Sequence, residues 1–73
     1  MPIKLLHHAK KRLRQRGIPK SLIYRIIEKP NDVIIQERGT KIYVGKYSGE
    51  KIFVVVFEQK RQIVVISVYY EKK

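Results

Sequence analysis

The residues of this chain whose types and spacing suggest chemistry lie between positions 8 and 18. On a helix, His8, Arg12 and Arg16 follow one another at i,i+4 spacing, so one stripe carries an imidazole and two guanidiniums. Like charges at this spacing destabilise an isolated helix by about 0.2–0.5 kcal/mol per pair, and a bound anion would offset that cost. A guanidinium pairs well with phosphate or carboxylate, and an imidazole transfers protons near neutral pH. The stripe therefore favours an anion-binding surface, with solvated helix cations as the alternative.

Arg16 occupies an unusual position for a cation. At about 100° per residue, it lies beside Leu5 and Ala9 on the apolar side of the helix. Leu6 and Leu13 complete that apolar arc. A guanidinium at the edge of a core needs partners for its planar donors, so we expect an anionic group or backbone carbonyls there.

Positive charge dominates the chain and is unevenly distributed. The 17 Lys and Arg residues face six acids, and residues 1–29 contain nine of the basic residues but a single acid. Basic residues concentrated on a helix are the usual electrostatic feature of a nucleic-acid-binding protein, although an acidic protein would be attracted equally. We therefore predict a nucleic acid as a partner, with contacts from Arg12, Lys10, Lys11 and Arg14.

Composition excludes several classes of site. The chain has no cysteine, which removes zinc ribbons, iron–sulfur clusters and thiol nucleophiles, and its two histidines make a histidine metal site unfavourable. The acids are scattered, which disfavours a two-metal nuclease, and no glycine-rich phosphate loop is present. We expect no metal and no cofactor.

Length and hydropathy indicate one small domain that spans residues 1–73. No apolar run approaches membrane-spanning length, and charged residues occur where a signal peptide requires apolar ones. We expect a cytoplasmic protein with no membrane partner.

The sequence predicts two helices followed by four strands. An amphipathic helix over residues 3–15 is closed by Gly17, and a shorter helix begins near Pro19 and stops before Pro30. Short polar connections separate four β-branched and aromatic runs, which implies antiparallel hairpins. These runs span residues 33–37, 41–47, 51–58 and 62–70. The predicted fold class is α+β, with two N-terminal helices packed on a four-stranded antiparallel β-sheet.

The last two predicted strands are apolar on both faces, so they should be central in the sheet. One face receives the helices, and the other is an apolar and aromatic surface. Ser67 is the only small polar side chain that the last strand contributes to that surface. Ser67 and Tyr69 are two residues apart and therefore point to the same side.

These residue types suffice for RNA cleavage without a metal. RNA supplies its own nucleophile, the 2′-hydroxyl, so a cleaving enzyme needs a proton acceptor, a proton donor and cations that stabilise the transition state. His8 can transfer protons, and Arg16 and Arg12 can bind the phosphate. Ser67 or Tyr69 can orient or protonate an oxygen. These residues also have structural explanations. His8 can be an exposed helix histidine, Ser67 a hydrogen-bonded strand hydroxyl and Tyr69 an aromatic residue of the sheet.

Three segments carry a family resemblance: His8-Ala9-x-x-Arg12-x-x-x-Arg16-Gly17-Ile18, a helix that ends at Lys29-Pro30, and the strand Val64-Val65-Ile66-Ser67-Val68-Tyr69. With these segments the chain resembles, from about His8 to Tyr70, small uncharacterised domains related to the BrnT and RelE ribonuclease toxins. It departs from their pattern at Ser67, where threonine is commoner, and at Pro19, where Ser or Thr is usual.

The resemblance implies a RelE-like fold and a metal-independent endoribonuclease of toxin–antitoxin type, held in check by an acidic antitoxin protein. It also implies a catalytic set of His8, Arg16, Ser67 and Tyr69. The alternative is a non-catalytic nucleic-acid-binding or protein-interaction module on the same scaffold.

Overall fold

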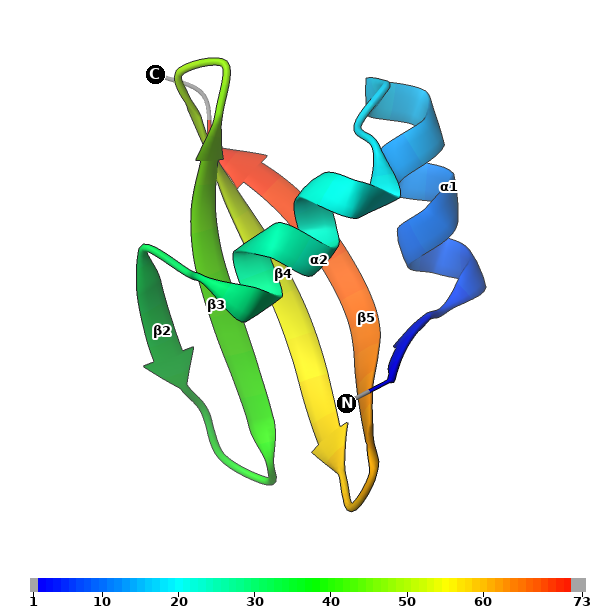
Figure 1. Cartoon of the computed structure of the whole chain (residues 1–73), viewed down its shortest axis with the longest axis vertical. Coiled ribbons are helices and arrows are strands. Elements are labelled where there is room, and N and C mark those ends of the chain that lie inside the picture. Colours follow the sequence, from blue (N-terminus) through cyan, green and yellow to red (C-terminus); the bar gives the residue numbers. More distant parts are fainter. Residues whose placement is uncertain (1, 72–73) are drawn as a thin grey trace.

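Two helices pack on one face of a five-stranded sheet in the computed structural model, which describes residues 2–71 (Figure 1). The order of the strands across the sheet is β1-β5-β4-β3-β2, and β1 with β5 is a parallel pair while the other neighbours are antiparallel. The fold class is therefore α+β. The elements are β1 (Ile3–Leu5), α1 (His7–Arg16), α2 (Lys20–Glu28), β2 (Asp32–Ile35), β3 (Thr40–Tyr47), β4 (Glu50–Gln59) and β5 (Gln62–Glu71).

The start of the first predicted helix is wrong. Ile3–Leu5 forms β1 instead, with Ile3 opposite Ile63 and Leu5 opposite Val65, so the sheet is mixed and five-stranded, not antiparallel and four-stranded. The backbone N–H of Ile63 donates to the carbonyl of Pro2 at 2.9 Å. Periodicity could not separate the two states, because a short apolar run suits a strand as well as the edge of a helix.

The predicted helix ends are close to those observed. Gly17 follows α1 with a left-handed φ of 66°, and the N–H of Ile18 donates to the carbonyl of Leu13 at 2.9 Å, which closes the last turn. Helix α2 begins immediately after Pro19, whose extended backbone leads into its first turn, and ends two residues before Pro30.

Strand β5 changes the direction of its side chains at a β-bulge. Val55 of β4 lies opposite Ser67, but Val56 lies opposite Val65, which leaves Ile66 as the extra residue. Before the bulge, Ile63 and Val65 face the helices. After the bulge, Val68 faces the helices and is fully buried. Ser67 and Tyr69 therefore lie on the side of the sheet turned away from the helices, which we call the open face.

The core lies between the helices and the central strands. In Figure 1, α2 crosses β3 and β4 while α1 lies beside β5. Helix α2 approaches the sheet closely at Gly45 of β3, where an added Cβ would lie 2.5 Å from Cγ1 and 2.7 Å from Cδ1 of Ile26. The buried apolar residues of this core are Leu5, Ala9, Leu13, Ile23, Ile26, Ile27, Ile52, Val54, Val56, Ile63, Val65 and Val68.

Gly45→Ala should lower the free energy of unfolding by about 1–3 kcal/mol, because overpacking forces α2 away from β3. Chemical denaturation measures this change. Adding Ile26→Ala removes all three Ile26 atoms that an added Cβ would meet, so the double variant should lose less stability than the sum of the two single variants. Strictly additive losses would show that Ile26 does not limit the approach.

Candidate functional site

Helix α1 presents a row of cations to solvent because its apolar side is fixed against the core. Ala9 is fully buried and Leu13 nearly so, which turns His8, Arg12 and Arg16 outward. The three side chains are exposed and lie at i,i+4 spacing along the helix. The structure thus assembles the helical part of the predicted site as one continuous stripe.

Arg16 is held by an aromatic ring. Its guanidinium carbon lies 4.6 Å from the centroid of the Tyr70 ring, within the range of a cation–π contact. The sequence predicts an anionic group or backbone carbonyls beside Arg16 at the edge of the core. In the structure Arg16 is exposed, and its contact is with the face of the Tyr70 ring. Among residues 2–71 the recorded ion pair is between Lys41 and Glu58, and the guanidinium donors of Arg16 stay available for an anion.

The Tyr70 ring lies between Arg16 and the core. It packs against the core, and its hydroxyl oxygen is buried with no hydrogen-bond partner. Burial raises the pKa of the Tyr70 phenol, and the positive charges of Arg16 and Arg12 oppose this only in part. A phenol with an ordinary pKa near 10 that is raised further is neutral at physiological pH. Tyr70 is therefore a platform for Arg16 and does not present a proton to solvent.

A shallow hollow of about 260 Å³ lies along the same side of α1. It is lined by His8, Lys11, Arg12 and Gln15, all of which carry hydrogen-bond donors or a positive charge. A phosphate group fits this chemistry, and His8 places a group able to transfer protons beside it. The other predicted contacts, Lys10 and Arg14, are exposed on the same helix.

Ser67 and Tyr69 are not brought to this stripe. Ser67 lies opposite Val55 and Tyr69 opposite Phe53, and the rings of Phe53 and Tyr69 stack with centroids 4.9 Å apart. These side chains occupy the open face, so the sheet separates them from His8 on the helical side. The cause is the bulge, after which Tyr70 rather than Tyr69 points toward α1. The contact of Tyr70 with α1 could have been predicted only by placing a bulge between Val65 and Val68. Both valines suit the core, but they are three residues apart, and a regular strand would put them on opposite faces.

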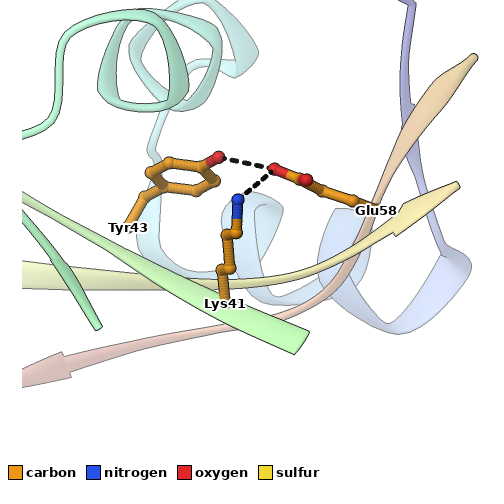
Figure 2. Close-up of polar contacts among 3 residues, drawn as sticks. All are labelled: Lys41, Tyr43 and Glu58. Carbon is orange, nitrogen blue, oxygen red and sulfur yellow. Dashed lines mark hydrogen bonds and ion pairs between the residues drawn. The ribbon is translucent and has the colours of Figure 1, made fainter. Parts of the chain in front are cut away.

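A second polar cluster joins β3 to β4 on the helical side of the sheet (Figure 2). Lys41 Nζ and the Tyr43 hydroxyl donate to Oε1 of Glu58 at 3.1 and 3.0 Å. These two hydrogen bonds hold the pKa of Glu58 below its ordinary value, while burial and the bond to Glu58 raise the pKa of Tyr43. A carboxylate stabilised in this way is a weak base, and we interpret the cluster as a structural link. Sequence reasoning missed it because the pairing depends on the register of the strands.

No group of three His, Asp or Glu side chains within residues 2–71 lies close enough together to hold a metal ion. None of the helices in this range is long and apolar enough to cross a membrane.

A model of a protein family matches most of the chain. The family is described as Domain of unknown function (DUF4258), and the match covers residues 5–70. No curated protein and no solved structure matches the chain. The matched residues include α1 and Tyr70, so the cationic stripe and its aromatic support both lie within the family domain.

The hydroxyls of Tyr70 and Tyr43 predict opposite effects of a Tyr→Phe substitution, because only the Tyr43 hydroxyl has a hydrogen-bond partner. Tyr70→Phe removes a buried hydroxyl that has no partner and keeps the ring under Arg16, so the free energy of unfolding should rise by about 1 kcal/mol. Tyr43→Phe is the matched control, because it removes the hydrogen bond to Glu58 and should lower the same quantity by about 1 kcal/mol. Denaturant titration at neutral pH compares them. Equal losses in both variants would mean that the Tyr70 hydroxyl is satisfied in solution.

Proposed function

Since the chain belongs to the DUF4258 family, whose description names no activity, we propose from its own geometry that it binds RNA through the cationic stripe of α1. The observation that carries this proposal is the guanidinium of Arg16, held over Tyr70 one helical turn from the hollow that Arg12 lines. Arg12 and Arg16 are both exposed, and neither forms an ion pair within residues 2–71.

The spacing and charge of the stripe suit a polyanion better than a single ion. Residues at i and i+4 are about 6 Å apart along a helix axis, so His8, Arg12 and Arg16 can contact successive phosphates of one strand. A guanidinium offers paired donors that match the oxygens of a phosphate. The remaining basic residues of α1 add attraction at longer range, which speeds association with nucleic acid.

RNA affinity should depend steeply on salt. For single strands the logarithm of the binding constant falls with the logarithm of salt concentration by about 0.7 per neutralised phosphate. Arg12→Gln combined with Arg16→Gln should weaken binding and reduce this slope by about 1.4, measured by fluorescence anisotropy with a labelled RNA. Arg25→Gln combined with Lys29→Gln removes the same charge at exposed sites in and after α2 and should change the slope less. A slope that is equal in both double variants contradicts the proposal.

A second candidate function is cleavage of the bound RNA, and the position of His8 in the hollow with Arg12 favours it. In this hypothesis the chain is a metal-independent endoribonuclease of the toxin–antitoxin type, related to the BrnT and RelE toxins. His8 takes the proton of the 2′-hydroxyl, whose oxygen forms a bond to phosphorus while the bond to the 5′-oxygen breaks. The arginines stabilise the transition-state charge, and water protonates the leaving oxygen.

Ser67 and Tyr69 have no part in this version of the mechanism, because they lie on the open face. The same candidate function includes an acidic antitoxin protein as a partner. An acidic segment over His8 and Arg16 would cover the stripe and offset repulsion among its cations.

Cleavage should proceed in excess chelator, leave a 2′,3′-cyclic phosphate and spare DNA, which lacks the nucleophile. His8→Gln should lower the rate by about 10²–10⁴-fold, while RNA affinity changes little. His7→Gln is the control, because it alters a neighbouring exposed histidine that does not line the hollow. Product analysis by mass spectrometry tests the claim. Cleavage that stops on chelation, or equal rates in both variants, would contradict it.

A further inference from the structure

The open face carries a stacked aromatic pair that no helix covers within residues 2–71. Phe53 and Tyr69 lie opposite each other in β4 and β5, with ring planes 10° from parallel and centroids 4.9 Å apart. Tyr69 is 39% exposed and Phe53 is partly so. Each ring covers one face of the other, and the outer face of the exposed Tyr69 ring is the kind of surface on which a nucleic-acid base stacks.

Two lysines lie directly opposite each other one step along the same face. Lys46 of β3 pairs in register with Lys51 of β4, next to the pair formed by Val44 and Phe53. Both lysines are exposed, and no ion pair involving either is recorded in the described part of the chain. Like charges directly opposite one another destabilise a sheet. Glu71 of β5 lies opposite Lys51 on its other side and offsets this repulsion there, so Lys46 has the stronger electrostatic reason to attract an anion.

Beyond the stacked pair, on the side away from the lysines, the open face is largely apolar. Val55 and Ser67 form the next cross-strand pair beyond Phe53 and Tyr69, and Phe57 lies further along β4 with 38% of its surface exposed. Exposed apolar patches rimmed by polar residues mark interaction sites. The combination of a stacked pair, an apolar floor and facing lysines matches the three parts of a nucleotide chain, namely a flat base, a sugar and a phosphate.

We propose that the open face is a binding surface for single-stranded RNA, on which bases stack against Tyr69 and Phe53 while Lys46 and Lys51 hold phosphates. This inference rests on the proposed RNA-binding function and extends it to a second face. Single strands are specified because the bases of a duplex are already stacked and paired. A second copy of this chain is a poorer occupant, because it would bring the lysine pairs and two net charges of +11 together.

The two faces meet at the end of β5. Tyr69 belongs to the open face and Tyr70 lies under Arg16, so consecutive residues serve the two surfaces. Strand β1 pairs with β5 only at residues 63–65, which leaves the rest of β5 without that neighbour. One RNA strand can therefore contact the stripe of α1 and continue around the end of β5 onto the open face.

The test uses a labelled oligouridylate alone and the same strand annealed to its complement. Tyr69→Leu should weaken binding of the single strand by about 5- to 150-fold, the value of one stacked base, and should affect the duplex little. Tyr24→Leu is the matched control, since Tyr24 has the same exposed fraction of 39% but lies on α2. Lys46→Gln with Lys51→Gln should reduce the salt slope more than Lys20→Gln with Lys29→Gln does.

The outcomes separate this inference from the proposed function. Loss of binding in the open-face variants, together with crosslinking of a 4-thiouridine strand at Tyr69 or Phe53, supports it. Unchanged single-strand affinity in those variants, with binding still dependent on Arg12 and Arg16, overturns this inference alone. If only the open-face variants lose affinity, the stripe on α1 is rejected instead. A dimer that Tyr69→Leu dissociates, seen by analytical ultracentrifugation, would overturn the RNA assignment of this face.

Discussion

Strand β5 buries apolar side chains along its whole length only because Ile66 is an extra, unpaired residue. With strict alternation, the residues that share a face with Val65 would include Ser67 and Tyr69, and a hydroxyl would enter the core beside the fully buried Val54. The bulge avoids that cost and places Val68 there instead. It also decides which tyrosine meets Arg16 and which one stacks on the opposite face, so both candidate surfaces depend on one backbone irregularity.

The elements with strong local signals could be predicted from the sequence. Gly17 and Pro30 mark the ends of α1 and α2, and the helical spacing of His8, Arg12 and Arg16 places them on one exposed stripe. Features that depend on how separate strands pair could not be predicted. The parallel position of Ile3–Leu5 depends on a pairing with residues 60 positions away, and the register shift in β5 depends on how that strand pairs with β4. The periodicity of one segment carries no information about either.

Charge and apolar surface are separated across the thickness of the molecule. The stripe of α1 is cationic and rests on buried Ala9 and Leu13, whereas the open face combines aromatic rings with a facing pair of lysines. In the proposed function, the first surface attracts polyanions with an affinity that falls with salt, while the second selects for unpaired bases. Cations on a helix attract an anion over a longer distance, and exposed rings distinguish unpaired bases from paired ones. In this fold the sheet places the cations and the rings on different faces.

The short parallel pair of β1 and β5 has a consequence for how the protein is made. Ile3 is synthesised well before its partner Ile63, which is added 60 positions later. Helix α1 packs mainly against β5, so its apolar side lacks its main partner until β5 has emerged. Contacts between such distant segments form late because closing a long loop costs entropy before it gains contacts. The Arg16–Tyr70 contact therefore exists only in the finished domain, and a chain truncated before β5 would retain the basic residues of α1 without the fixed surface that they form.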